Sequence, residues 1–177
     1  MAFFPNITTS NPKRRRRLIN LLIILVVSGA LIALDQWLKW FVFKNPIFNG
    51  EERSLGWIGF RRVKHPNSSL FNWLQIQVPP AAFAGVGTAL ALLVFLIAVL
   101  NRRKIVAFCL AITLAGLLGN TLDWYIFGYV RDVIYTPWAD RGTFNIADVL
   151  IVGGAVSTVA VTITCEIIAS VRNRAVV

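Results

Sequence analysis

The chain has 177 residues, 56% of them hydrophobic, and a formal net charge of +10. Its mean hydropathy of +0.66 lies outside the range usual for soluble globular domains. One histidine and two cysteines, both cysteines within apolar segments, argue against a zinc-bound or disulfide-stapled domain. The length suits one domain, and the composition indicates that the bilayer is its solvent.

Four apolar segments are each long enough, at about 20 residues or more, to cross the hydrocarbon core as helices. They cover residues 18–43, 80–100, 105–130 and 146–171. The sequence therefore predicts an all-α membrane protein in which residues 18–171 form one domain of four transmembrane helices.

Basic residues gather at three places beside these segments, at Lys13–Arg17, Arg102–Lys104 and Arg172–Arg174. Cytoplasmic loops close to helix ends retain Lys and Arg, so all three clusters belong on one side of the membrane. Both ends of the chain are then cytoplasmic tails: residues 1–17 are expected to be disordered and basic, and residues 172–177 form a short tail. We expect the basic run to contact anionic lipids and not nucleic acid, since no aromatic stacking platform surrounds it.

The two remaining loops, residues 44–78 and 131–144, face outward in this topology. The first loop is rich in β-branched and aromatic residues with partial alternation, in "SLGWIGFRRVKH" at 54–65 and "NWLQIQV" at 72–78. The turn-like "PNSS" separates the two stretches. We expect a small β-element from this first outer loop to lie on the outer face of the helices.

Four aspartates fall at or near the outer ends of the predicted helices: Asp35, Asp123, Asp132 and Asp148. Asp132 is expected at the outer end of the third helix. Each alone could cap a helix or meet water, and Asp148 lies in a first helical turn, where the helix dipole favours an anion. Four carboxylates at one depth of a membrane protein are costly, however, and such groups by default suggest function.

Paired carboxylates can hydrolyse a peptide bond without a metal, a cofactor or a covalent intermediate. One, ionised, takes a proton from water while the other, protonated, polarises the scissile carbonyl, because two close like charges cannot both stay ionised. The sequence has no plausible zinc ligand set, no Ser/His/Asp arrangement and no Gly-rich phosphate loop. The single histidine, His65, is expected to be a surface or turn residue.

Three motifs that contain these aspartates resemble those of the signal peptidase II family, the bacterial lipoprotein signal peptidases. "LDQWLK" is similar to D-Q-x-x-K, and "FNIAD" is similar to F-N-x-A-D. "GNTLDWYIFGYVRD" resembles G-N-x-x-D-R-x-x-x-G-x-V-x-D. Their order, their spacing and the four-helix topology fit, so the resemblance covers nearly the whole chain after the N-terminal tail.

The resemblance implies that Asp132 and Asp148 form the catalytic dyad of a membrane aspartic endopeptidase. It also implies that Asn120 and Asn145 support the dyad and the substrate by hydrogen bonding. No metal and no cofactor would be needed for this reaction.

The remaining motif residues belong, by the same resemblance, to the surroundings of the substrate. Asp123 would be structural or part of the substrate site, and Asp35 and Lys39 would line its entrance. The substrate would be a prolipoprotein whose lipobox Cys already carries diacylglycerol, cut on the N-terminal side of that Cys. The protein would lie in the bacterial cell (inner) membrane with its active site at the outer face.

Two places depart from the family motifs. Trp124 follows Asp123 where the motif has Arg. The outer-loop motif N-x-G-A-A-F falls on "HPNSSL", with His65 at the Asn position and Asn67 at the Gly position. Both departures concern substrate binding and leave the presumed dyad intact.

These departures leave an alternative interpretation open. The chain could be a non-catalytic homologue that acts as an accessory or assembly subunit of a membrane complex, with its additional tryptophans as a binding surface. A proton or ion pathway fits less well, because the acidic residues cluster at one face and form no relay across the bilayer.

Overall fold

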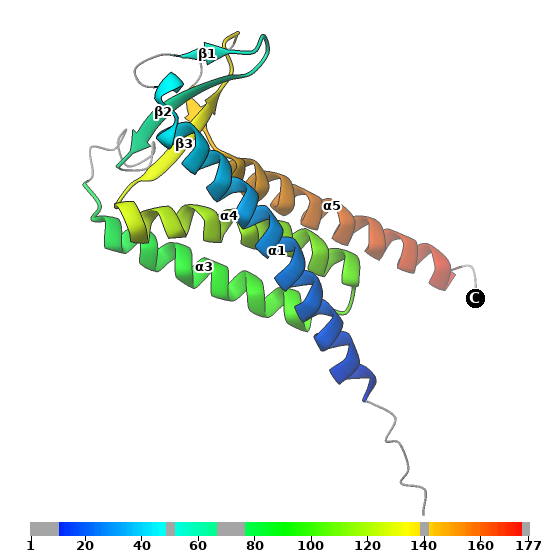
Figure 1. Ribbon diagram of the computed structural model, residues 1–177. Helices are drawn as coiled ribbons and strands as arrows, with labels where there is room; N and C mark the ends of the chain where they lie inside the picture. Colours follow the sequence, from blue (N-terminus) through cyan, green and yellow to red (C-terminus); the bar gives the residue numbers. More distant parts are fainter. Residues whose placement is uncertain (1–10, 49–51, 67–76, 139–141, 175–177) are drawn as a thin grey trace, which may run out of the picture.

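Four long helices and a small sheet make up the protein, and the computed structural model describes residues 11–48, 52–66, 77–138 and 142–174 (Figure 1). The helices are α1 (Pro12–Lys44), α3 (Pro80–Leu100), α4 (Lys104–Phe127) and α5 (Ile146–Arg174). All four are long and apolar enough to cross a membrane. The prediction of a multi-pass protein with four spans is confirmed.

The first helix starts earlier than the sequence pattern predicts, at Pro12 instead of residue 18. The side chain of Asn11 accepts a hydrogen bond from the backbone N–H of Lys13, and Pro12 is suited to the first helical position. The basic run therefore forms the first turns of α1, which corrects the expectation that it belongs to a disordered tail. Residues 1–10 lie outside the described part of the chain.

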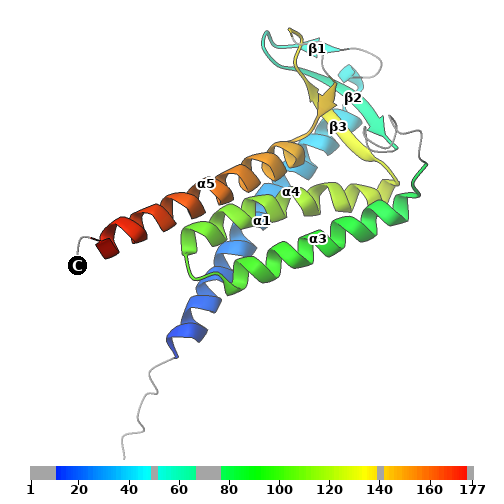
Figure 2. The ribbon, with the colours of Figure 1, turned by 180° about the vertical axis from the view of Figure 1, so that it is seen from behind.

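Helix α4 is the centre of the bundle. Of the 18 residues that form its most apolar stretch, 61% are buried, compared with 11% to 22% in the other three helices. Ala107, Ala111 and Ala115 are fully buried at four-residue intervals, and such small residues let helices approach closely. A Cβ added to Gly116 would clash with the carbonyl oxygen of Ala147. The start of α5 is therefore pressed against α4, while α1 crosses the other face of α4 (Figure 2).

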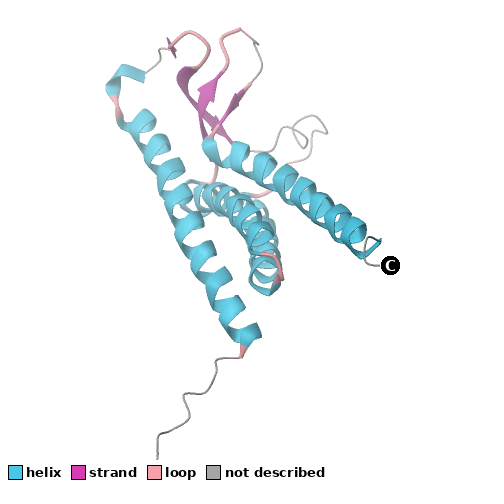
Figure 3. Cartoon of the chain, turned by 90° about the vertical axis from the view of Figure 1, so that its right-hand side faces the viewer, coloured by secondary structure: helices cyan, strands magenta, loops and turns pink. Residues whose placement is uncertain are grey.

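The sheet has four antiparallel strands in the order β1-β2-β3-β4 and lies beyond the ends of the helices (Figure 3). The strands are β1 (Arg53–Ser54), β2 (Gly59–His65), β3 (Val130–Tyr135) and β4 (Thr143–Phe144). Strands β1 and β2 confirm the β-element predicted from the first outer loop. The second predicted stretch, 72–78, falls mainly on residues outside the described ranges, and residues 77 and 78 are not in a strand.

Strands β3 and β4 come from a segment for which the sequence pattern predicts no strand. It predicts a helix over 105–130, but α4 ends at Phe127 because Gly128 takes a left-handed conformation with φ 72°. The chain then turns and β3 begins at Val130, so Asp132 lies on a strand and not at the predicted helix end. Periodicity alone does not separate a short apolar strand from one more helical turn.

The sheet is attached to the C-terminal end of α1. Arg62 of β2 donates from Nε to the carbonyl oxygen of Val42 at 2.9 Å, and so satisfies a carbonyl near the end of that helix. Val42 also packs in an apolar cluster with Val133 of β3 and with Phe48 of the 3-10 helix η1 (Pro46–Phe48). Because Val133 follows Asp132 in β3, this cluster fixes the strand beside that aspartate.

Candidate active site

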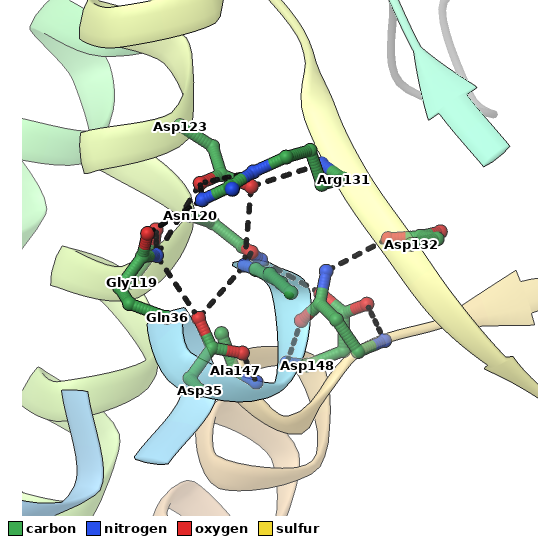
Figure 4. Close-up of polar contacts among 11 residues, drawn as sticks. Asp35, Gln36, Gly119, Asn120, Asp123, Arg131, Asp132, Ala147 and Asp148 are labelled. Atoms are coloured by element: carbon green, nitrogen blue, oxygen red, sulfur yellow. Dashed lines mark hydrogen bonds and ion pairs between the residues drawn. The ribbon is translucent and has the colours of Figure 1, made fainter. Parts of the chain in front are cut away.

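The four aspartates meet at the junction between the helices and the sheet, although each comes from a different element (Figure 4). Asp35 lies on α1, Asp123 on α4, Asp132 on β3 and Asp148 in the first turn of α5. The first three are buried, and each of the four accepts at least one hydrogen bond. They divide into two groups, a charge-balanced network and an aspartate pair.

Two buried cations neutralise Asp35 and Asp123. Lys39 Nζ lies 2.8 Å from Asp35 Oδ2 and 3.3 Å from Asp123 Oδ2, and all three side chains are at most 1% exposed. Arg131 Nη2 lies 2.7 Å from the other oxygen of Asp123. Two carboxylates therefore face two cations, the balance that charges need in an apolar interior.

Asp123 also holds strand β3 against the bundle. Arg131 donates its backbone N–H to Asp123 Oδ2 at 2.9 Å, in addition to the contacts of its guanidinium group. Gln36 of α1 donates to Asp123 Oδ1 at 3.3 Å and to Asp35 Oδ2 at 3.2 Å, and its Oε1 accepts from Arg131 at 2.6 Å. This network therefore joins α1, α4 and β3.

Sequence reasoning missed two members of this network, Gln36 and Arg131. Gln36 is the second residue of the D-Q-x-x-K motif, and that position was the available signal. Arg131 is a basic residue directly before a presumed catalytic aspartate. Trp124, which stands where the family motif has Arg, instead stacks on Phe83 of α3 with ring centroids 4.5 Å apart. In this chain Arg131, and not residue 124, places a guanidinium group beside Asp123.

Asn145 joins Asp132 to Asp148. Its Nδ2 donates to Asp132 Oδ1 at 2.7 Å, and its Oδ1 accepts from the backbone N–H of Asp148 at 2.9 Å. Asp148 Oδ2 accepts from the backbone N–H of Asn145 at 3.2 Å, which completes a reciprocal cap on the first turn of α5. Asn120 Nδ2 donates to the other oxygen of Asp148 at 2.7 Å. The structure thus brings together the four residues predicted as the dyad and its amide support.

Two hydrogen bonds connect the charge network to the aspartate pair. Lys39 donates to Asn120 Oδ1 at 3.1 Å, which leaves the amide N–H of Asn120 directed at Asp148. Asp35 Oδ1 accepts from the backbone N–H of Ala147 at 2.9 Å and so positions the start of α5. Asp35 and Lys39 are themselves 1% and 0% exposed. They support the pair from within the protein and do not line an entrance. Their opposite charges neutralise each other, which makes this burial possible.

The two aspartates of the pair have unequal surroundings. Burial and then the nearby charge of Asp148 raise the pKa of Asp132 from its usual 3.8 to about 7, against the opposing effects of the Asn145 hydrogen bond and the Lys39 charge. The carboxylate of Asp148, by contrast, accepts hydrogen bonds at both oxygens and lies in the first turn of α5. Near neutral pH the arrangement can therefore hold a proton on Asp132.

His65 is also at the site, which corrects the expectation of an ordinary surface or turn residue. It is the last residue of β2, and its Nε2 lies 3.1 Å from Asp132 Oδ2 and 3.2 Å from Thr143 Oγ1. The side chain is 34% exposed, so the ring connects the buried carboxyl group to solvent. Asn67, the other altered position of that motif, lies outside the described residues.

Among the described residues, no three His, Cys, Asp or Glu side chains are grouped so that they could hold a metal ion. The arrangement offers two carboxyl groups linked through Asn145, one of them with a raised pKa, as groups for acid-base chemistry.

The fold and the site define a four-span membrane protein with a hydrogen-bonded aspartate pair at one end of its helix bundle. The family model for signal peptidase (SPase) II matches residues 27–164, and the chain belongs to this family of aspartic membrane peptidases. That range contains all three motifs named from the sequence.

Individual relatives agree with this assignment. The chain is 32% identical over 148 residues to a lipoprotein signal peptidase of Serratia marcescens, which covers 75% of this chain and 79% of the relative. It is 27% identical over 138 residues to a lipoprotein signal peptidase of Enterococcus faecalis, covering 77% and 84% of the two chains. A bacterial membrane enzyme solved at 2.3 Å resolution shares the fold with a TM-score of 0.68 at 16% identity, over 80% of this chain and 87% of the other.

The charge network predicts that Asp123→Asn lowers the yield and thermal stability of the folded protein, because Lys39 and Arg131 keep their charges in a buried place. Removing one partner of a buried ion pair typically costs about 3 to 5 kcal/mol. Thermal unfolding in detergent, followed by tryptophan fluorescence, measures the loss. The double variant Asp123→Asn with Arg131→Gln restores the charge balance and should recover part of it. Unfolding of Asp123→Asn at the parent's temperature would show that the network does not hold β3.

Asp132→Asn should have the opposite effect on stability. The folded protein binds the Asp132 proton more tightly than the unfolded chain does, so the contribution of that proton is full below about pH 4 and is lost as the pH rises through about 7. An uncharged Asn avoids this loss. The variant should therefore unfold a few degrees higher than the parent at pH 8, and the difference should shrink at pH 4. A lower unfolding temperature at pH 8 would contradict the raised pKa of Asp132.

Proposed function

We propose that this protein is an aspartic endopeptidase that removes signal peptides from diacylglyceryl-modified prolipoproteins, cutting on the N-terminal side of the lipobox Cys. The observation that carries the proposal is the unequal pair bridged by Asn145, in which the pKa of Asp132 is raised to about 7 and Asp148 accepts two hydrogen bonds. The names of the relatives support the substrate class, since they are lipoprotein signal peptidases.

In the proposed reaction Asp148 is the base and Asp132 is the acid. Asp148 takes a proton from a water molecule whose oxygen attacks the carbonyl carbon of the scissile bond, while Asp132 gives its proton to the carbonyl oxygen. When the tetrahedral intermediate collapses, that hydroxyl group returns a proton to Asp132. Asp148 gives its proton to the leaving amine nitrogen as the C–N bond breaks. Both carboxyl groups then have their starting protonation states.

The depth of the site suits a lipid-bearing substrate. Large apolar side chains such as Leu22, Leu92 and Val159 are exposed along the helices, while the aspartate pair lies at the end of the bundle that carries the sheet. A Cys that carries diacylglycerol keeps its acyl chains in the hydrocarbon, and the peptide bond before it then lies at the level of the lipid headgroups. The substrate can thus reach the pair while its acyl chains stay in the membrane.

The proposed location is the bacterial inner membrane, with both termini in the cytoplasm and the active site at the outer face. The basic residues support this orientation, because Lys13–Arg17, Arg102–Lys104 and Arg172–Arg174 all lie at the ends of helices away from the sheet. The multi-pass fold and the bacterial membrane enzyme among its structural neighbours agree with it.

A second candidate function, an accessory subunit of a membrane complex, is favoured by one surface feature. Trp57 and Trp138 are 78% and 67% exposed and pack edge to face at the tip of the sheet, beside an exposed Leu55. Exposed tryptophans are common at binding surfaces. This candidate requires no turnover, so a test of the aspartate pair separates it from the peptidase.

Either Asp132→Asn or Asp148→Asn should reduce cleavage of a diacylglyceryl-modified lipobox peptide nearly as far as the double substitution does, because the two groups act as one unit. The parent's kcat/KM should fall as the pH rises through about 7, where Asp132 loses the proton that it donates. Both variants should still accumulate in the membrane, since Asn retains the size of Asp.

The matched control for this experiment is Glu52→Gln, which removes an exposed acid that pairs with Arg61 away from the site. It should cleave at the parent's rate. Turnover by Asp132→Asn at the parent's rate would contradict the catalytic assignment, and the accessory-subunit function would become the better proposal.

The orientation predicts opposite labelling of two engineered cysteines in a protein from which Cys109 and Cys165 have been removed. Ser54→Cys, in the exposed strand β1, should react with an impermeant thiol reagent in intact cells. Arg103→Cys, in the turn between α3 and α4, should react only after the membrane is permeabilised. Labelling of residue 103 but not of residue 54 in intact cells would reverse the orientation and place the aspartate pair on the cytoplasmic face.

A further inference from the structure

The outward-facing oxygen of Asp132 is contacted by an imidazole ring. His65 is the only histidine of the chain, and it ends strand β2, which pairs with β3. Its Nε2 lies 3.1 Å from Asp132 Oδ2, and Thr143 Oγ1 lies 3.2 Å from the same nitrogen. Two neighbouring strands, β3 and β4, therefore fix the position of the ring at the aspartate pair.

The two oxygens of Asp132 have different partners. Oδ1 accepts the amide N–H of Asn145 at 2.7 Å, and an amide donates at any pH. An acid proton on Asp132 therefore belongs on Oδ2, the oxygen that faces His65. The proton that the proposed reaction needs lies between Asp132 and a histidine, the side chain whose charge changes most readily near neutral pH.

We propose that His65 is a positioning residue of the aspartate pair, which orients the acid proton of Asp132 while its ring is neutral and abolishes the acid when its ring is protonated. This inference rests on the proposed peptidase function. In the neutral ring Nε2 accepts the O–H of Asp132. When the ring takes a proton from water, Nε2 becomes a donor and can no longer accept that O–H. The proton of Asp132 then passes to Asp148, so the two aspartates exchange protonation states and neither has the one that the proposed reaction needs.

The other charged groups around the ring do not replace His65 in this role. Lys39 and Arg131 are neutralised by Asp35 and Asp123 inside the buried network. Lys64, the neighbour of His65 in β2, lies over the ring of Tyr129. Asp148 is bonded at both oxygens to Asn120 and Asn145. Within the described part of the chain, His65 is thus the titratable group that both contacts Asp132 and is open to water.

The test compares the pH dependence of cleavage by the parent and by His65→Asn, whose amide can donate or accept a hydrogen bond but cannot gain a proton. At pH 7.5 the variant should cleave within a few-fold of the parent, with KM unchanged. One pH unit below the parent's acidic midpoint, the parent should have lost about tenfold in kcat/KM, and the variant should remain near its maximum. His65→Ala, which lacks the hydrogen bond, should have a lower kcat at all pH values. His65→Asn should keep most of the kcat that His65→Ala loses.

Lys64→Gln is the matched control, because it removes a positive charge from the same strand without contacting the pair. The kcat/KM of this variant should fall at acidic pH with the same midpoint as in the parent. The inference would be overturned if the acidic midpoint of kcat/KM in His65→Asn were the same as in the parent, or if it shifted by the same amount in Lys64→Gln.

A second measurement tests the contact without cleavage. Because the chain has one histidine, a full-length protein purified without a histidine tag and labelled with ¹⁵N-histidine gives signals from His65 alone. The Nε2 signal should move in Asp132→Asn and stay in place in Lys64→Gln. An Nε2 signal with the same chemical shift in Asp132→Asn as in the parent would overturn the inference. A signal that responds, in a protein that cleaves no lipobox peptide, would overturn the proposed peptidase function instead.

Discussion

One buried carboxylate, that of Asp123, decides whether the site can form. Asp123 lies in the last turns of α4, and it accepts both the backbone N–H and the guanidinium group of Arg131, the second residue of β3. The residue after Arg131 is Asp132, so the bond that attaches the strand to the bundle also places the acid of the pair. Lys39 and Gln36 hold the same carboxylate from α1. A single aspartate thus aligns three elements that are distant in the sequence.

The other half of the pair is placed by ordinary helix capping. Asn145 and Asp148 exchange the reciprocal hydrogen bonds that close the first turn of a helix. The cap leaves the side-chain N–H of Asn145 for Asp132, while the backbone N–H of Asn145 donates to the carboxylate of Asp148, so one residue both starts α5 and links the two carboxyl groups. Because the capped carboxylate is bonded to donors and the strand carboxyl group is buried, the two aspartates have unequal surroundings, as the proposed reaction requires of its acid and its base.

Much of this arrangement could be predicted from sequence, for a physical reason in each case. The four spans follow from apolar runs long enough to cross a bilayer, and the aspartates stand out because ionisable residues are rare near such runs. The apolar run continues to Val130 and so places the end of α4 too late, whereas the left-handed Gly128 ends the helix and lets a strand begin. The contact of His65 could not be predicted, because it depends on the pairing of β2 with β3 across a separation of more than sixty residues.

The departure at Trp124 is understandable from the same geometry. Residues 124 and 131 lie on either side of the turn at Gly128. A cation at position 124 is next to Asp123 on the helix, and a cation at position 131 is close to Asp123 from the strand that follows the turn. With Arg at 131, the guanidinium group bonds Asp123 and Gln36 and lies over the ring of Phe127, inside the network. Position 124 is then free to take an aromatic ring that packs on Phe83 and ties α4 to α3.

The charge balance around Asp123 is kept, while a cation that could contact substrate from the helix is replaced by an apolar surface. In the proposed reaction, the two departures from the motif therefore concern different steps: Trp124 concerns what binds next to α4, and His65 concerns the proton of Asp132.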